Sequence, residues 1–315
     1  MALGTGRLAG KLIGLARFRP RVQAHGSTAA RCMTFASGYP TRLIATLTLL
    51  ASSLLAGCQS PMAQLQSLST QYAHQVEVLP TSPFPLASSL PLRLPKQPRL
   101  RVYLEGDGHA WATARQPSLD PSPQHLLMAQ LALSDPRPSA YLARPCQFVS
   151  AAGCTAAIWT DQRFSTTVLR SLDQALDRLK QRYGNQDFEL IGYSGGAALA
   201  LLLAARRDDI AQVQTLAGNL SPRLWVNALG LSPLHGSLEP LDQAPKLARV
   251  AQRHLLGQAD RSVPASLYPA YRQALGTKAL CVQSVSLPGV THDQGWAEAW
   301  RHWRDQPLSC ASPGN

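Results

Sequence analysis

The first 57 residues contain no aspartate or glutamate, although they hold seven of the 30 lysines and arginines of this 315-residue chain. An uncharged, mostly apolar run from Leu43 to Ala56 follows Arg42, and it is too short for a helix that crosses a bilayer. A basic start without acids, followed by a short apolar run, is typical of a targeting segment. We therefore expect residues 1–57 to be removed as a leader.

The rest of the chain lacks the patterns of two other protein classes. Without the leader, 23 lysines and arginines face 18 acidic residues, so the net charge falls from +12 to +5. No basic stripe interleaved with aromatic residues is present, and we expect no nucleic-acid partner. No Cys-x-x-Cys or His-x-x-x-His spacing occurs, and we expect neither a metal site nor a cofactor.

The apolar run ends in Leu55-Ala56-Gly57-Cys58. This ending resembles the lipobox of a bacterial lipoprotein signal, which implies cleavage before Cys58 and attachment of lipid to that cysteine. Gln59 stands where an inner-membrane retention signal would place aspartate, so the resemblance implies the outer membrane, on its periplasmic side. An ordinary secretory signal or a membrane anchor is the alternative interpretation. Met33 is an alternative start, because residues 1–32 exceed a signal of normal length.

The cysteines of an exported chain are available for disulfides. Cys32 lies in the leader and Cys58 is the expected lipid site. The remaining four allow three pairings. We favour the two pairs that are close in sequence, since each would tie a loop or tail to a neighbouring core element. These pairs are Cys146 with Cys154, and Cys281 with Cys310.

Strand and helix patterns alternate along residues 98–315, which we predict to form one domain. Apolar runs and alternating patterns predict strands near residues 100–104, 140–143, 188–193, 213–217, 253–257 and 280–287. Helical spacing predicts helices over residues 164–179 and 197–205. Three further helices are expected: one begins at Ser122-Pro123, one begins near Pro264, and one ends near Trp303. Such alternation predicts a doubly wound α/β fold with a mostly parallel sheet.

Two segments fall outside that alternation. Residues 58–97 are expected to form a tether with a helix over residues 63–74, and then an edge segment whose prolines permit only edge strands or extended chain. Residues 218–245, between the predicted strands near residues 213–217 and 253–257, are rich in proline, glycine and leucine. A long segment of this kind is usually a lid or a binding loop.

The strongest motif is Gly192-Tyr193-Ser194-Gly195-Gly196, which lies between a predicted strand and an apolar helix. The glycines allow strand and helix to approach closely around a serine in a strained turn. Ser194 would then lie at the edge of the sheet, at a helix N-terminus that favours developing negative charge.

Two further polar residues follow predicted strands, Asp260 after residues 253–257 and His292 after residues 280–287. The order Ser194, Asp260, His292 resembles the α/β-hydrolase superfamily over about residues 98–305. The resemblance implies that Ser194 is the nucleophile, His292 the base and Asp260 the acid that orients the imidazole. Asp242 and Asp293 are the alternative acids.

Three other histidines are interpreted as structural, namely His235, His254 and His302.

An oxyanion hole needs two N–H donors. Gly195 would supply one, as the residue after the nucleophile. The loop after Leu104 reads Glu105-Gly106-Asp107-Gly108, where the superfamily often carries His-Gly, and leaves Gly106 and Asp107 as equal candidates for the second. Trp111 and Trp159 are candidates for the acyl pocket.

These patterns predict a lipid-anchored serine hydrolase that cleaves an ester, thioester or amide of a small or lipid-like acyl substrate through an acyl-enzyme. The alternative is a non-catalytic envelope lipoprotein that uses the same fold as a binding platform. The sequence does not indicate an oligomeric state.

Overall fold

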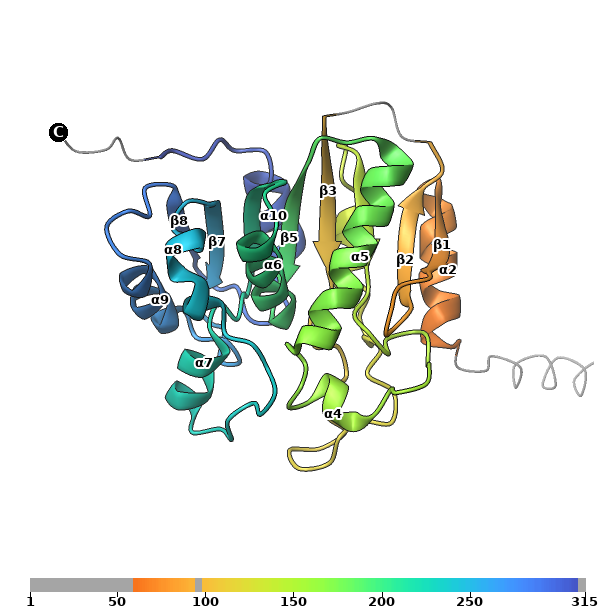
Figure 1. The fold of residues 1–315 in the computed structure, drawn as a ribbon, viewed down its shortest axis with the longest axis horizontal. Coiled ribbons are helices and arrows are strands. Elements are labelled where there is room, and N and C mark those ends of the chain that lie inside the picture. Colours follow the sequence, from red (N-terminus) through yellow and green to blue (C-terminus); the bar gives the residue numbers. More distant parts are fainter. Residues whose placement is uncertain (1–58, 94–97, 311–315) are drawn as a thin grey trace, which may run out of the picture. The chain divides into compact units, whose positions relative to one another are not determined.

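The computed structural model describes residues 59–93 and 98–310, which are built around an eight-stranded sheet (Figure 1). The predicted leader, the alternative start at Met33 and the lipidation site Cys58 lie outside the described residues. The strand order is β1-β2-β4-β3-β5-β6-β7-β8. The strands are β1 (His74–Leu79), β2 (Leu86–Pro91), β3 (Arg99–Leu104), β4 (Ser139–Leu142), β5 (Asp187–Tyr193), β6 (Ile210–Leu216), β7 (Ala251–Gly257) and β8 (Val282–Leu287).

The prediction of a mostly parallel sheet is confirmed. Strands β3 to β8 run parallel, and β2 pairs antiparallel with both β1 and β4. Because the parallel strands end at one edge, the loops that follow them meet there. This carboxyl edge of the sheet faces downward in Figure 1.

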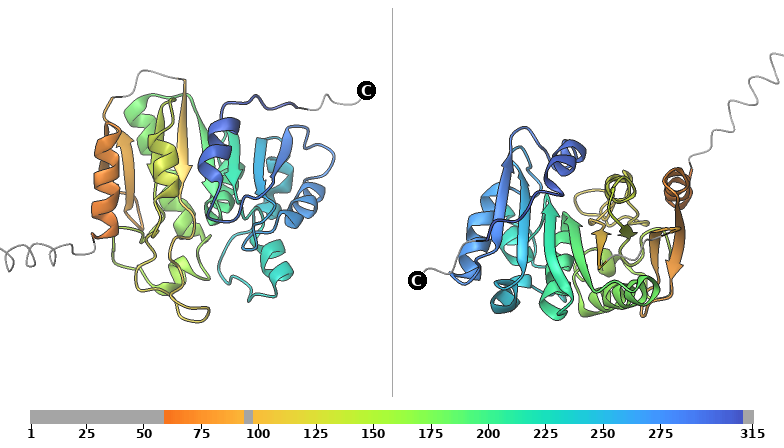
Figure 2. Two further views of the ribbon diagram at one scale, coloured as in Figure 1. Left: turned by 180° about the vertical axis from the view of Figure 1, so that it is seen from behind. Right: turned by 90° about the horizontal axis from the view of Figure 1, so that it is seen from above.

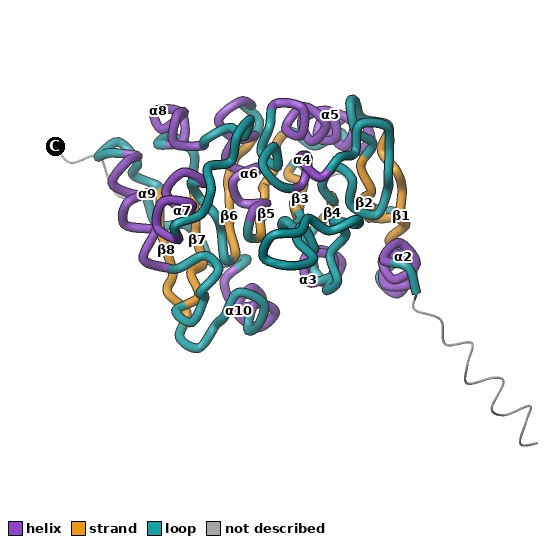
Figure 3. Tube along the Cα trace, turned by 90° about the horizontal axis from the view of Figure 1, so that it is seen from below, coloured by secondary structure: helices purple, strands orange, loops and turns teal. Residues whose placement is uncertain are grey.

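Helices cover both faces of the sheet (Figures 2 and 3). The apolar core on one face includes residues of α5, α6, α8 and α9, whereas the core on the other face includes residues of α2, α3 and α10. The helices are α2 (Pro61–Gln71), α3 (Leu127–Leu133), α4 (Ala156–Trp159), α5 (Thr166–Tyr183), α6 (Gly195–Arg206), α7 (Pro222–Leu229), α8 (Ala244–Leu247), α9 (Tyr268–Leu275) and α10 (Trp296–Trp303), with 3-10 turns η1 (Pro240–Gln243) and η2 (Ala265–Leu267). No helix within the described ranges is both long and apolar enough to span a bilayer.

Local sequence explains where α5 begins and ends. The Ser165 side chain accepts a hydrogen bond from the Val168 N–H, and Gly184 closes the helix with φ 66°. Its apolar positions share one face and are buried against the sheet. By contrast, every residue of α6 from Gly195 to Ala205 is buried, which agrees with its uninterrupted apolar sequence.

One predicted helix start is wrong. The helix expected to open at Ser122-Pro123 begins at Leu127 as α3. The Ser122 hydroxyl instead accepts a hydrogen bond from the Phe148 N–H at 2.6 Å. Ser122 therefore ties two loops together and caps no helix.

The segment before residue 98 contributes two strands to the sheet. Strand β1 is an edge strand, as the sequence allows, but β2 lies between β1 and β4. Its serines are fully buried, and their hydroxyls have partners: Ser88 donates to the Glu77 carbonyl at 2.9 Å, and Ser89 pairs with Ser69 at 2.8 Å. These hydrogen bonds let a polar sequence occupy an interior strand.

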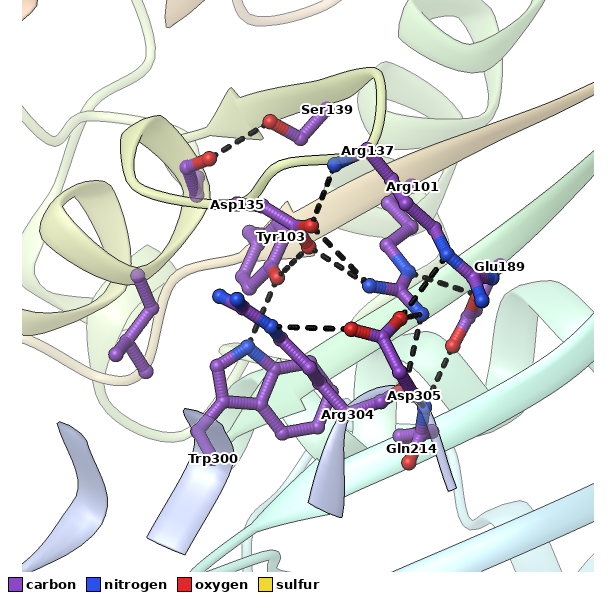
Figure 4. Close-up of polar contacts among 12 residues, drawn as sticks. Arg101, Tyr103, Asp135, Arg137, Ser139, Glu189, Gln214, Trp300, Arg304 and Asp305 are labelled. Atoms are coloured by element: carbon purple, nitrogen blue, oxygen red, sulfur yellow. Dashed lines mark hydrogen bonds and ion pairs between the residues drawn. The ribbon is translucent and has the colours of Figure 1, made fainter. Parts of the chain in front are cut away.

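A buried polar network joins the sheet to the ends of α3 and α10 (Figure 4). The Arg101 guanidinium forms ion pairs with Asp135 at 3.0 Å and Glu189 at 2.9 Å, and donates to the carbonyl of Arg304 at 2.8 Å. The Trp300 indole donates to the Tyr103 hydroxyl at 2.9 Å. This network fixes α10, the helix that follows the loop of His292.

The structure contains two disulfides, Cys146 to Cys154 and Cys281 to Cys310, which is the pairing favoured from the sequence. The second joins the residue before β8 to the chain that leaves α10. It therefore connects both ends of the segment that carries His292.

Candidate active site

Ser194 lies in a sharp turn between β5 and α6, with φ 51° and ψ −121°. A positive φ is unfavourable for a residue with a side chain, so the packing around the turn must hold it in place. A Cβ on Gly192 would lie 2.6 Å from the Ala197 Cα, and one on Gly196 would lie 2.6 Å from the Leu104 carbonyl oxygen. Both glycines are therefore required by close backbone packing.

The structure brings Ser194, His292 and Asp260 together at the carboxyl edge of the sheet. His292 Nε2 lies 3.1 Å from the Ser194 Oγ, and His292 Nδ1 lies 2.9 Å from Asp260 Oδ2. The other Asp260 oxygen accepts the N–H groups of Ser262 at 2.8 Å and Val263 at 2.9 Å. With its Nδ1 proton directed at Asp260, the imidazole presents Nε2 as an acceptor for the serine proton.

Neither alternative acid bonds to the imidazole of His292. Asp242 lies in η1 and pairs with Arg223 at 3.0 Å. Asp293 is next to His292 in sequence, but its carboxylate lies 3.2 Å from the Tyr193 hydroxyl.

The three histidines that the sequence analysis interprets as structural lie away from this constellation. His254 is fully buried in β7, where its ring nitrogens meet Thr215 Oγ1 at 2.8 Å and Gln252 Oε1 at 3.0 Å. Burial lowers the pKa of His254 to about 3, so it stays neutral. His302 is exposed on α10, and His235 is exposed between α7 and η1.

Two aromatic side chains hold the backbone of His292. The Tyr193 hydroxyl lies 2.8 Å from the His292 carbonyl oxygen, and the Trp296 indole N–H donates to the same oxygen at 2.7 Å. The Tyr193 ring also lies beside the imidazole, with centroids 5.4 Å apart. His292 is thus positioned through its main chain as well as through Asp260.

The two candidates for the second oxyanion donor differ in their hydrogen bonds. The Gly106 N–H donates to Glu105 Oε1 at 2.9 Å, while the other oxygen of Glu105 accepts from the Tyr141 hydroxyl at 2.8 Å. Burial raises the pKa of Glu105 to about 7. Within residues 59–93 and 98–310, nothing accepts from the N–H of Asp107 or Gly195. Asp107 is therefore the better candidate, together with Gly195.

The side chain of Asp107 binds two arginines, which was not expected from the sequence. Arg144 donates to one of its carboxylate oxygens and Arg163 to the other at 2.6 Å. Burial by itself raises the pKa of Asp107, but the two guanidinium groups outweigh burial and lower it to about 2. A Cβ on Gly195 would collide with this carboxylate. Two arginines thus leave a net positive charge beside the first residue of α6.

Ser194 and His292 open into a cavity of about 700 Å³. Trp111 lines this cavity, as expected, but Trp159 does not and packs against the core instead. Trp225 of α7 also lines it, and its indole donates to the Ser262 carbonyl at 2.7 Å. Part of the segment 218–245 therefore forms a wall of the cavity, consistent with its prediction as a binding loop.

No protein-family model and no curated protein matches the sequence. Solved structures resemble it in fold. An esterase from Pyrococcus furiosus superposes with a TM-score of 0.56 at 12% identity, over 79% of this chain and 92% of the other. Est1E from Butyrivibrio proteoclasticus gives 0.50 at 15% identity, over 72% of this chain and 94% of the other. An acylaminoacyl peptidase from Pyrococcus horikoshii gives 0.51 at 11% identity, over 70% of this chain and 37% of the other.

The chain has the α/β-hydrolase fold. Identities this low establish the fold and assign no role to any residue. Three residues of the cavity region were not singled out from the sequence, namely Arg144, Arg163 and Trp225. Only Arg144 has a local signal, because it closely follows a predicted strand and is therefore expected at the carboxyl edge of the sheet. Arg163 and Trp225 reach the cavity from a loop and a helix that are far away in sequence, and no local sequence pattern predicts their positions.

Proposed function

We propose that this chain is a serine hydrolase that cleaves a carboxylic ester, thioester or amide through an acyl-enzyme. The observation that carries the proposal is the pair of distances from His292, 3.1 Å to the Ser194 hydroxyl and 2.9 Å to the Asp260 carboxylate. A serine hydroxyl becomes a strong nucleophile only when a base accepts its proton, and this geometry provides such a base.

The reaction would proceed in two halves. Ser194 Oγ attacks the carbonyl carbon while its proton moves to His292 Nε2, and the carbonyl oxygen becomes an oxyanion. The N–H groups of Gly195 and Asp107 would stabilise that charge, assisted by Arg144 and Arg163. Collapse breaks the bond to the leaving group, which takes the proton from His292. Water then attacks the acyl-enzyme, gives one proton to His292 and releases the acid, and Ser194 regains the proton.

We also propose that a lipid on Cys58 anchors the mature protein to the periplasmic face of the outer membrane. The basic start, the short apolar run and the sequence 55–58 support this proposal. Mass spectrometry of the N-terminal peptide from protein isolated from membranes should find Cys58 as the first residue, carrying acyl chains. An unmodified N-terminus at any other residue would overturn the anchor.

A fluorophosphonate probe tests the catalytic proposal directly. We expect covalent labelling of Ser194 and hydrolysis of p-nitrophenyl esters, with Ser194→Ala lowering the rate at least about a thousandfold. His292→Ala should cost about as much, because residues that act as a unit do not lose activity additively. His302→Ala is the matched control, since that side chain lies away from the cavity.

Each variant is compared by circular dichroism to establish that it is folded. Folded wild-type protein that neither takes the label nor hydrolyses esters would refute catalysis and favour the binding-platform alternative. Retention of most activity by Ser194→Ala would refute the assignment of the nucleophile.

A further inference from the structure

Exposed apolar side chains gather at the carboxyl edge of the sheet. Single exposed leucines are ordinary on protein surfaces, so their distribution is the informative feature. Two of these side chains lie at the opposite edge, Tyr72 after α2 and Leu92 after β2. Among residues 59–93 and 98–310, the other five large ones belong to β1 near its carboxyl end, to the loop after β3 and to the end of α7: Val78, Trp111, Leu119, Leu229 and Leu231.

Four of them belong to the two segments that line the cavity of Ser194 through Trp111 and Trp225, and we call this group the apolar rim: Trp111, Leu119, Leu229 and Leu231. The first two belong to a loop closed by hydrogen bonds from the His109 N–H to the Pro121 carbonyl and from the Ser118 N–H to the Ala110 carbonyl. The Leu119 side chain is 97% exposed there. The other two follow Trp225, which lines the cavity from α7. Figure 3 looks onto this edge, with α7 toward one side of the view.

Topology places the start of the folded domain at the same edge. Strand β1 is antiparallel to β2 and β2 is antiparallel to β4, so β1 runs parallel to β4 and β3. Helix α2 turns back into β1 through residues 72–73 and packs along it in the opposite direction. Pro61 at the beginning of α2 therefore lies at the carboxyl edge, as Figure 1 shows.

We infer that the apolar rim docks onto the lipid surface, so that the cavity of Ser194 opens toward the membrane and takes amphiphilic esters. The inference rests on the proposed function, because the anchor at Cys58 would attach three residues before Pro61. A protein anchored at that edge keeps the apolar rim close to the bilayer. The lipid then has a high effective concentration at the rim, so that even weak apolar contacts form for much of the time. The contacts are apolar, so neutral lipids suffice and salt has little effect.

Docking is tested on the anchored protein reconstituted in neutral phosphatidylcholine vesicles whose acyl chains carry bromine, which quenches nearby tryptophans. The Ser194→Ala variant is used so that no lipid is consumed. We expect clear quenching relative to unbrominated vesicles, and loss of at least half of it in Trp111→Phe. The double change Leu119→Ser with Leu231→Ser should also reduce quenching at least twofold. Leu92→Ser is the matched control, because that leucine is 58% exposed at the opposite edge.

Absence of quenching, equal quenching in the double variant, or an equal loss in Leu92→Ser would each overturn the docking surface. Turnover then separates this inference from the proposed function. In active protein, the ratio of vesicle-borne ester hydrolysis to soluble ester hydrolysis should fall at least threefold in the double variant and stay unchanged in Leu92→Ser. An unchanged ratio in the double variant refutes delivery from the membrane. A wild-type protein that fluorophosphonate does not label refutes catalysis, whatever the quenching.

Discussion

Two arginines of β3 provide a test of how burial and the number of carboxylate partners set the contribution of an ion pair to stability. Arg99 and Arg101 each pair with a carboxylate on β5, Asp187 and Glu189 respectively. The Arg99 side chain is 41% exposed, whereas that of Arg101 is 2% exposed and also pairs with Asp135. Burial by itself lowers the pKa of Arg101, but the two carboxylates outweigh burial and raise it above its ordinary value, so the group stays charged.

We expect Arg101→Met to destabilise the fold by about 3 to 5 kcal/mol, because it leaves Asp135 and Glu189 buried without a cation. For a domain of this size that loss lowers the melting temperature by roughly 10 °C. Arg99→Met should cost at most about 1 kcal/mol, since water solvates the freed Asp187. Urea and thermal denaturation followed by circular dichroism measure both losses.

Equal losses in the two variants would refute the reasoning, because Arg101 is more buried than Arg99 and also pairs with Asp135 and Asp305. A loss below about 1 kcal/mol for Arg101→Met would show that Asp135 and Glu189 find other partners or water. The network also holds the end of α10, so ester turnover should fall in Arg101→Met and not in Arg99→Met.

Two further predictions concern the disulfides and a buried acid. Cys310→Ala should lower the free energy of unfolding by about 3 to 4 kcal/mol in the chain-entropy model and should also reduce kcat. Cys154→Ala should reduce kcat less. Thermal melts and ester kinetics of each variant measure these effects. Burial raises the pKa of Glu105 from 4.5 to about 7, so its contribution to folding is fully present below about pH 4.5 and is lost as pH rises through 7. The melting temperature of wild type should therefore fall more between pH 5 and 8 than that of Glu105→Gln, and parallel curves would contradict this.

Much of the fold and the triad constellation could be predicted from the sequence because they follow from short-range patterns. Apolar runs bounded by glycine and polar residues mark the parallel strands, and the ends of parallel strands meet at one edge. Ser194, Asp260 and His292 each follow such a run, so their meeting at that edge needs no knowledge of side-chain packing.

The remaining features depend on partners that are distant in sequence. Asp107 was expected to contribute only a backbone N–H, and its carboxylate is held by Arg144 and Arg163, 37 and 56 residues away. Strand β2 contains Ser88 and Ser89, whose hydrogen bonds to other elements make their burial possible. The position of Arg144 after a predicted strand indicates the carboxyl edge, but no periodic pattern indicates which partners these side chains have.

The placement of His292 poses a specific physical problem, because His292 follows β8, which in the described part of the chain is the last strand of the sheet and pairs with β7. An edge strand has one neighbour to fix its position, whereas β5, which leads to Ser194, has two. Hydrogen bonds other than those between β-strands add restraints on the segment that carries His292. Arg253 of β7 donates to the carbonyl of Trp303 at the end of α10 and to those of Gln306 and Pro307 beyond it.

The Cys281 to Cys310 disulfide connects the two ends of the same segment, and the Tyr193 and Trp296 side chains hold the His292 carbonyl in the middle. Because these restraints act at separate points, loss of one should weaken the position of the base without releasing it. The 3.1 Å contact between His292 and Ser194 is therefore a property of the whole segment from β8 to the end of α10, and so variants far from the cavity are expected to change turnover.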